Sequence, residues 1–446
     1  MITTFHISWD DIFTLFGLIR RKAFLILLFS FFALTCKKES PVTPSMNPLQ
    51  LTVESVSCTD VYLRLSLSSI ETQRTLALKR NDSTVAMISL SAGDSLFDDE
   101  GLLPSKTYTY TLVLNSWSTT AQAITLDTTS HNFTWQTFTF GGDAGSCQLN
   151  DVAIINDTLA YAVGAVYLND STGQIDPQPY GIAEWNGAAW RLGKIFDNKA
   201  HIITPIRGID ILDTSNIWLA AGSIYYWDGH SEQVQLNFSR LILPNPNGTI
   251  EKLFGAEWTN LFGVGNAGTI VCYSGNGWQS LQSGTGLSLN DVWGGSNPWI
   301  GNDVLLIAAS EKYVAGEKKL LALDNHGTLD SIPWPMQDRR INSVWYDEQS
   351  HVYTSGGGVF RYNGSGSWIE QPLPLIYTNR IRGNADNDIV AVGDFGIAAH
   401  FNGVTWHVYD ELQLSNGNYE SVAIRGNLVI AVGWNGESGY IAAGKR

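Results

Sequence analysis

Three arginines have the side-chain type and the placement that could support chemistry on an anionic ligand. Arg207, Arg380 and Arg382 lie at or close to predicted strands with which repeated units of the chain begin. A guanidinium group binds a carboxylate through two parallel hydrogen bonds, so arginines that converge on one cavity could hold an acidic group. No tyrosine–glutamate pair is marked near them, and we therefore predict no catalytic residues.

Two tryptophans are further candidates for contact with a ligand. Trp293 and Trp345 lie near the ends of two of the predicted strands that begin a unit. An aromatic ring in that position either faces a ligand at a channel mouth or packs between neighbouring units, and the sequence leaves both alternatives open.

Metal and cofactor chemistry find no support in the sequence. The histidines have neither HExxH nor HxH spacing, and no GxSxG or phosphate-binding loop is found in a suitable context. The three cysteines after Cys36 lack the CxxC spacing of a zinc site. We therefore predict no metal site and no cofactor.

The charge distribution argues against nucleic acid as a partner. The formal net charge is −15, and no basic run beyond residue 40 is longer than a pair. Binding to phosphates requires clustered lysine and arginine side chains.

The N-terminal segment indicates where in the cell the protein is located. Arg20-Arg21-Lys22 precedes the apolar run AFLILLFSFFALT, which ends at Cys36 and is short for a membrane span. This pattern resembles the lipoprotein signal of bacteria, in particular of Bacteroidota-like species, although Thr35 replaces the usual small residue. The resemblance implies cleavage before Cys36 and attachment of a diacylglycerol to its sulfur. A plain secretory signal or an uncleaved anchor is the alternative.

This signal pattern predicts how the N-terminal region is divided and that the protein is attached to a membrane. We expect a signal segment at 1–36, of which 1–19 fit a mis-assigned start, and a tether at 37–47. The protein would then be held on the lipid bilayer of the outer membrane, facing either the periplasm or the exterior.

Residues 48–128 contain short strands with alternating apolar side chains, which is typical of a β-sandwich. The segment GLLPSKTYTYTL at 101–112 resembles the corner before the F strand of fibronectin type III domains. The resemblance implies that the hydroxyl of Tyr108 bonds back to the nearby backbone, and that the domain serves mainly as a spacer.

Residues 131–446 contain a sequence pattern of three predicted strands that recurs along the chain. A short strand is followed by an apolar strand that usually runs into glycine, and a third strand then turns before a tryptophan, as at Trp190, Trp278, Trp368 and Trp406. Unit starts recur at intervals of roughly 38 to 57 residues, which is about the size of a four-stranded propeller blade. The string VGDFGI at 392–397 with Trp406 resembles the BNR-like and photosystem II assembly-factor-like propeller repeats. We predict seven blades, with six or eight as alternatives.

The stretch HNFTWQTFTF at 131–140 has the form of a fourth blade strand without a blade before it, and the last unit ends after its third strand. We predict that residues 132–140 pair with the C-terminal strand and close the ring, because closure removes the exposed sheet edges.

The expected function is non-catalytic binding of a protein or a glycan by the propeller. The alternative is a glycan-acting hydrolase or lyase, since the shape resembles sialidase-like propellers, in which three arginines hold a carboxylate beside a tyrosine nucleophile. Arginines with paired carboxylates at the channel mouth would favour the enzyme, and an aromatic, neutral mouth would favour the binding protein.

Overall fold

The computed structural model describes residues 47–68, 72–257, 260–297, 300–311, 316–324, 326–346, 351–362, 367–374 and 377–446. The predicted signal segment, with Cys36, lies outside these residues. Among them, no helix is long and apolar enough to span a membrane.

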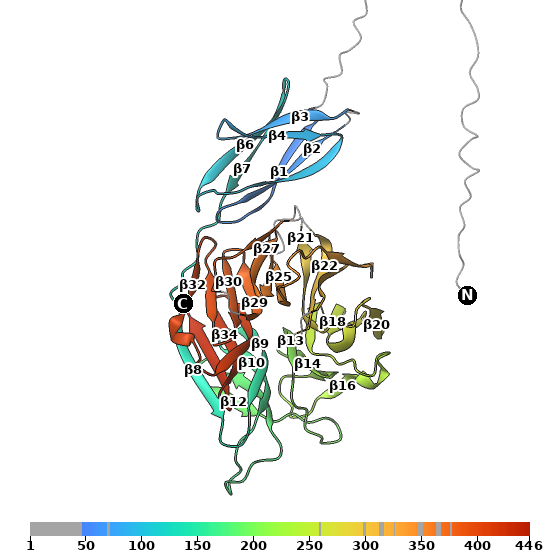
Figure 1. The fold of residues 1–446 in the computed structure, drawn as a ribbon, viewed down its shortest axis with the longest axis vertical. Helices are drawn as coiled ribbons and strands as arrows, with labels where there is room; N and C mark the ends of the chain where they lie inside the picture. The colour runs from blue at the N-terminus through green and yellow to red at the C-terminus, as the bar shows by residue number, and fades with distance from the viewer. Residues whose placement is uncertain are drawn as a thin grey trace, which may run out of the picture. The chain divides into compact units, whose positions relative to one another are not determined.

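Residues 49–124 form two antiparallel sheets, shown in blue to teal in Figure 1. One sheet has the order β1-β2-β5 and the other the order β4-β3-β6-β7, with bounds β1 (Leu49–Val56), β2 (Val61–Leu67), β3 (Arg74–Arg80), β4 (Ser83–Leu90), β5 (Gly93–Asp99), β6 (Thr107–Leu114) and β7 (Trp117–Ile124). Leucines that alternate along β2, β3 and β6 fill the core between the sheets. The hydroxyl of Tyr108 accepts a hydrogen bond from the backbone N–H of Leu103 at 3.0 Å, which is the contact that a tyrosine corner makes.

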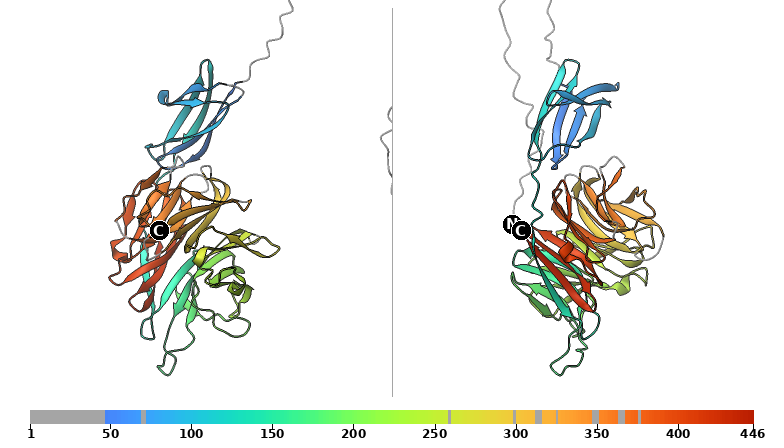
Figure 2. Two further views of the ribbon diagram at one scale, coloured as in Figure 1. Left: turned by 45° about the vertical axis from the view of Figure 1, so that its right-hand side comes forward. Right: turned by 60° about the vertical axis from the view of Figure 1, so that its left-hand side comes forward.

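The rest of the described chain folds into four-stranded antiparallel sheets, which are the blades of a β-propeller (Figures 1 and 2). The first three blades contain β9 (Gln148–Asn156), β10 (Leu159–Val166), β11 (Tyr180–Trp185) and β12 (Trp190–Gly193); β13 (Gly208–Asp213), β14 (Asn216–Ala221), β15 (Ser223–Trp227) and β16 (Gln235–Phe238); and β17 (Lys252–Glu257), β18 (Asn260–Val264), β19 (Thr269–Tyr273) and β20 (Trp278–Gln282).

Three further blades follow in the same order along the chain. They contain β21 (Leu289–Asn297), β22 (Gly301–Ser310), β23 (Lys318–Leu323) and β24 (Leu329–Ile332); β25 (Ile341–Tyr346), β26 (Val352–Gly356), β27 (Gly358–Tyr362) and β28 (Trp368–Glu370); and β29 (Thr378–Ala385), β30 (Asp388–Gly393), β31 (Ala398–Phe401) and β32 (Trp406–Val408). The sequence repeat is therefore a repeat of blades, and the predicted tryptophans are the first residues of β12, β20, β28 and β32. Each packs against an aromatic residue of the third strand, as in the pair Phe401–Trp406 with ring centroids 5.2 Å apart.

The last blade combines the two ends of the propeller. It consists of β33 (Gly417–Arg425), β34 (Leu428–Asn435), β35 (Ser438–Lys445) and the distant β8 (Thr134–Gly141). Strand β8 pairs antiparallel with β35 from Thr134–Lys445 to Gly141–Ser438, so the predicted closing pairing is present. The first strands of the blades contact one another in chain order, and β33 also contacts β9, which completes a ring around a central channel.

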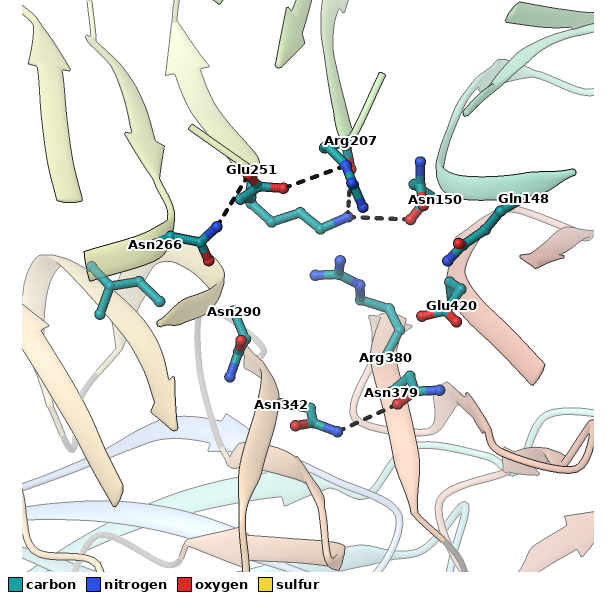
Figure 3. A pocket seen from close by; sticks show the side chains of 12 residues that line it. Gln148, Asn150, Arg207, Glu251, Asn266, Asn290, Asn342, Asn379, Arg380 and Glu420 are labelled. Atoms are coloured by element: carbon teal, nitrogen blue, oxygen red, sulfur yellow. Dashed lines mark hydrogen bonds and ion pairs between the residues drawn. The ribbon is translucent and has the colours of Figure 1, made fainter. Parts of the chain in front are cut away.

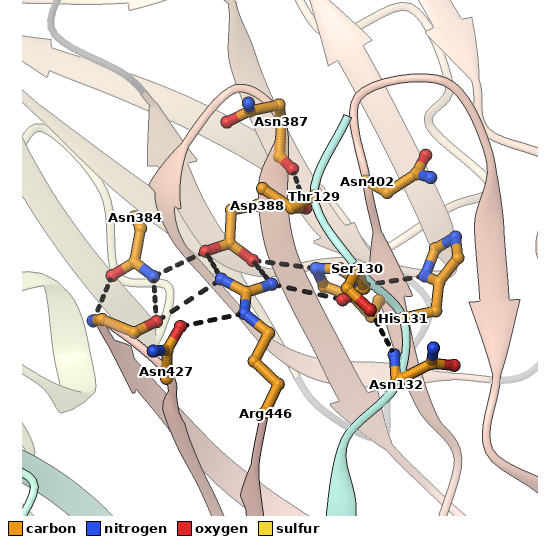
Figure 4. A network of polar contacts seen from close by, with 12 residues as sticks. Thr129, Ser130, His131, Asn132, Asn384, Asn387, Asp388, Asn402, Asn427 and Arg446 are labelled. Carbon is orange, nitrogen blue, oxygen red and sulfur yellow. Dashed lines mark hydrogen bonds and ion pairs between the residues drawn. The ribbon is translucent and has the colours of Figure 1, made fainter. Parts of the chain in front are cut away.

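A polar network holds the segment before β8 in place (Figure 4). The buried carboxylate of Asp388 accepts hydrogen bonds from His400 at 2.8 Å and from Arg446 at 2.9 Å. Arg446 also donates to the carbonyl of Ser130 at 3.3 Å, and His131 contacts His400 with 2.8 Å between their Nδ1 atoms. Burial, and then the charges of the neighbouring histidines, lower the pKa of His131 to about 4, so this imidazole is neutral at neutral pH.

Two glycines at the ends of second strands, Gly164 and Gly433, have a role that differs from our expectation, whereas Gly222 has the expected left-handed φ of +77°. We expected them at sharp turns, but Gly164 and Gly433 do not have left-handed φ angles. A Cβ atom at Gly164 would lie 2.0 Å from the carbonyl oxygen of Gln148, and one at Gly433 would lie 1.9 Å from that of Asn418. The missing side chain lets the first and second strands approach closely where the channel opens.

Candidate binding site at the channel mouth

A β-bulge at the start of the first strand aims two consecutive side chains toward the channel. Residues of a regular strand alternate between its faces. The register of the first strand shifts between Leu149 and Asp151, and equivalent shifts occur in β21, β25, β29 and β33. A bulge adds one residue and turns its side chain in a new direction. The bulged residues are Asn150, Asn290, Asn342, Asn379 and Glu420, and all of them line one cavity.

This cavity of about 200 Å³, here called the first mouth, is lined by polar side chains with the exception of Leu289. Figure 3 shows its side chains arranged around a common centre. Besides the bulged residues, its polar lining consists of Gln148, Arg207, Glu251, Lys252, Asn266 and Arg380. Six of the lining side chains are therefore carboxamides.

Four of the asparagines also join neighbouring blades. The amide nitrogen of Asn150 donates to the carbonyl oxygen of Ile206 at 2.8 Å, and that of Asn379 donates to the carbonyl of Tyr419 at 3.0 Å. Asn290 and Asn342 make the same bond to Ile341 and Thr378, at 3.2 and 3.1 Å. Each acceptor immediately precedes the mouth-lining residue of the next blade. The carboxamides are thus held in fixed orientations around the mouth.

Below the first mouth, the channel is filled by charged side chains that neutralise one another. Asp291 is 1% exposed and accepts hydrogen bonds from Arg380, from Ser343 and, at 2.8 and 2.9 Å, from Arg382. Burial alone would raise the pKa of Asp291, but the charges of Arg380 and Arg382 outweigh this effect and hold the pKa well below its usual range.

A second ion pair, between Lys252 and Asp151, lies beside Arg380 at the floor of the first mouth. The ammonium group of Lys252 lies 3.1 Å from the carboxylate of Asp151, which also accepts a hydrogen bond from Ser421 at 2.6 Å. Burial, and then the charge of Arg380, lower the pKa of Lys252 to about 8. The floor of the first mouth is therefore charged but internally paired.

The opposite end of the channel, here called the second mouth, is a cavity of about 270 Å³ with a more apolar lining. Phe254 and Trp293 are neighbours in it, with ring centroids 5.5 Å apart, and the guanidinium carbon of Arg382 lies 4.8 Å from the centre of the Trp293 ring. Burial raises the pKa of Asp210 to about 6, and one oxygen of this carboxylate has no hydrogen-bond partner among the described residues.

The structure distributes the candidate residues over both mouths. Arg207 and Arg380 line the first mouth, whereas Trp293 and Arg382 line the second. Of the two alternatives left open for Trp345, the structure shows packing between blades rather than the ligand contact, because this residue is only 2% exposed and packs against Tyr353 and Ile381. Its ring leaves almost no surface for a ligand.

The three arginines do not form an empty carboxylate-binding set. Arg380 and Arg382 both bind Asp291, and Arg207 lies 3.8 Å from Glu251 at the edge of the first mouth. No tyrosine is found among the described residues that line this mouth. The arrangement gives no support to sialidase-like chemistry. The described residues also contain no group of three or more side chains suited to hold a metal ion.

Sequence reasoning missed the asparagines, although the sequence carries a signal for them. The pairs Asn150-Asp151, Asn290-Asp291, Asn342-Ser343 and Asn379-Arg380 occur at the same place in their units. Two consecutive polar residues interrupt the alternation expected of a strand, and such an interruption at one fixed place indicates a bulge.

Comparisons with known proteins agree with the fold. No known protein family and no curated protein matches the sequence. A solved structure described as YCF48 bound to D1 peptide is 13% identical, with a TM-score of 0.51 over 72% of this chain and 99% of that one. The WD40 β-propeller domain of Doa1 is 12% identical, with a TM-score of 0.51 over 70% and 97% of the two chains. Virginiamycin B lyase from Staphylococcus aureus is 11% identical, with a TM-score of 0.49 over 71% and 100%. At these identities the likeness to YCF48 and to the Doa1 domain concerns the fold alone, and it is the fold of β-propeller proteins.

Proposed function

We propose that this protein is a non-catalytic binding module of the bacterial cell envelope, and that its first mouth holds a peptide segment of a partner protein. The ring of carboxamide side chains carries this proposal. A carboxamide carries a donor and an acceptor, as a peptide bond does. The amide nitrogens of Asn290, Asn342 and Asn379 already donate within the protein, so the ring offers mainly carbonyl oxygens, which can accept hydrogen bonds from the backbone N–H groups of an extended segment.

The charges of the first mouth agree with a peptide ligand. Lys252 and Arg380 are paired with carboxylates below the ring, while Arg207, Glu251 and Glu420 of both signs stand in its lining. A mouth of mixed charge fits a polypeptide better than a purely anionic ligand. YCF48, a protein of the same fold, has been observed with a peptide bound, which supports the choice of ligand.

The number of propeller blades and the type of the domain before the propeller are also part of the proposal. The closed ring of first strands supports seven blades, and the contact between Tyr108 and Leu103 supports a fibronectin type III-like spacer over residues 48–128. The propeller would then occupy residues 131–446.

We further propose that Cys36 carries a lipid that anchors the protein to the outer membrane, on its periplasmic or its surface face. The basic residues and the apolar run before Cys36 support this. Growth with an alkyne-tagged fatty acid should label the wild-type protein and leave Cys36→Ala unlabelled. Equal labelling of both proteins would contradict the anchor.

Peptide binding is tested with a phage-displayed library of random dodecapeptides selected on the purified protein. The selected peptides are synthesised with a fluorescent label, and their affinities are measured by fluorescence anisotropy. Arg207→Ala and Asn266→Ala remove exposed parts of the first mouth, and loss of hydrogen bonds to such groups should weaken binding about tenfold.

The matched control is Arg425→Ala, which removes an exposed arginine from the second mouth. We expect its affinity to equal that of the wild type. If no peptide is enriched, or if Arg425→Ala weakens binding while Arg207→Ala and Asn266→Ala do not, the proposed site is wrong.

A further inference from the structure

The turn between β30 and β31 holds a phenylalanine in a backbone conformation that phenylalanine rarely adopts. Phe395 has a φ of +56° and Gly396 a φ of +71°, so two consecutive residues are left-handed. Glycine, asparagine and aspartate are preferred in such hairpin turns, and a bulky residue with positive φ is an outlier. The side chain of Phe395 is 63% exposed, so its burial does little to offset the strain.

The same turn elsewhere in the chain shows that the fold does not require an aromatic residue there. Between β18 and β19, Ala267 and Gly268 have φ angles of +55° and +68°. A small side chain therefore suffices for the conformation. Strained residues persist mainly where they serve a function, which makes the ring of Phe395 a candidate for contact with a partner.

Contacts connect Phe395 to the first mouth. The preceding residue, Asp394, accepts a hydrogen bond from the amide of the mouth-lining Asn379 at 3.0 Å, and its carboxylate lies 3.8 Å from Arg340. The guanidinium carbon of Arg340 lies 3.7 Å from the centre of the Tyr377 ring, and Tyr377 is 50% exposed. The backbone N–H of Asp394 also donates to the carbonyl of Tyr377 at 2.9 Å, so both aromatic residues are close to a residue that contacts the carboxamide ring. We call Phe395 and Tyr377 the aromatic rim.

We propose that the aromatic rim packs against an aliphatic or aromatic side chain of the peptide that the first mouth holds. This inference rests on the proposed function. Aromatic residues next to arginine are typical of the residues that dominate binding energy at protein interfaces. Because the rim continues the carboxamide ring through Asp394, one extended segment can contact both, with its backbone in the mouth and an apolar side chain on the rim.

The decisive variant is Phe395→Asn, because asparagine tolerates the left-handed conformation and lacks the ring. We expect the Tm to rise by about 1–3 °C as the strain is relieved. We expect the affinity for peptides selected on the wild type to fall at least about tenfold. A gain in stability together with a loss of binding is the signature of a residue kept for its contact with a partner.

Leu241→Asn is the matched control, since Leu241 is 85% exposed and lies in the short helix at Arg240–Ile242, remote in sequence from the rim. Its affinity for the peptides should be unchanged. If Phe395→Asn binds like the wild type while Arg207→Ala binds weakly, the rim has no role and the proposed function stands. If neither variant weakens binding, both proposals fail. A lower Tm for Phe395→Asn would contradict the strain argument.

Two other occupants of the rim are distinguished in the same experiment. Flotation with phosphatidylethanolamine–phosphatidylglycerol vesicles tests a lipid surface, and sedimentation velocity tests a second copy of this chain. If the wild type binds vesicles or dimerises and Phe395→Asn does neither, the rim has that occupant and the peptide proposal is overturned.

Discussion

Replacing Trp135 with glycine should destabilise the propeller by about 3 kcal/mol, because a large aromatic side chain is removed from the strand that closes the ring. The Trp135 ring packs against Phe133 and Tyr409, with centroids 5.7 and 5.1 Å away, and covers the backbone of Gly444 in the paired strand. On the other face of β8, Phe138 packs against Trp185 of the first blade. Strand β8 therefore contributes to the cores on both sides of the last blade.

Hydrogen exchange measures this effect by region. In Trp135→Gly, we expect faster exchange of backbone amides in β33, β34 and β35. Trp117→Gly is the matched control, since Trp117 lies in β7 and packs on the core of the sandwich. It should accelerate exchange in residues 49–124 and leave the last blade unchanged. If Trp135→Gly affects only the sandwich, β8 does not close the propeller.

Replacing Asp291 with alanine should cost about 3–5 kcal/mol of unfolding free energy, since it leaves the buried guanidinium group of Arg380 and the partly buried one of Arg382 without their carboxylate. Arg380 is 3% exposed, and its remaining carboxylate neighbour, Asp151, is 4.0 Å away. Asp143→Ala is the control, because Asp143 is exposed, and its unfolding free energy in urea should match that of the wild type.

The lowered pKa of Asp291 also predicts how the unfolding free energy of the wild type changes in acid. A carboxyl group with a lowered pKa in the folded state adds stability above its unfolded pKa of about 4, and this stability is lost as the pH falls below that value. The unfolding free energy of the wild type should therefore decrease below about pH 4. Asp291→Ala should show a shallower decrease over that range, and an equal slope in both proteins would contradict the role of Asp291.

Most of the architecture could be predicted from the sequence because each blade repeats the same local requirements. The alternating strands, the polar turn and the tryptophan at the start of the fourth strand recur often enough to show the period. The pairing of β8 with β35 was predictable as well, since one end of the propeller has a surplus strand and the other lacks one.

The candidate site was only partly predictable, because its character depends on contacts between blades. The positions of Arg380 and Arg382 in the channel follow from the repeat, but their pairing with Asp291 joins residues about ninety positions apart. Trp293 and Trp345 occupy equivalent positions, yet Trp345 fits over Gly383 of the next blade, where a Cβ atom would lie 2.7 Å from its ring. At the place equivalent to Gly383, Trp293 meets Tyr346 and donates a hydrogen bond to its carbonyl at 3.2 Å, so it stays partly exposed.

The central claim is that the first mouth binds a peptide, and photo-crosslinking of a selected peptide tests it most directly. The peptide carries benzoylphenylalanine in place of its apolar residue, and the modified residues of the protein are located by mass spectrometry. We predict crosslinks to the first mouth and its rim, at and around Asn266, Asn290, Asn342, Tyr377 and Phe395. Crosslinks concentrated around Phe254, Trp293 and Arg425, at the second mouth, would contradict the account.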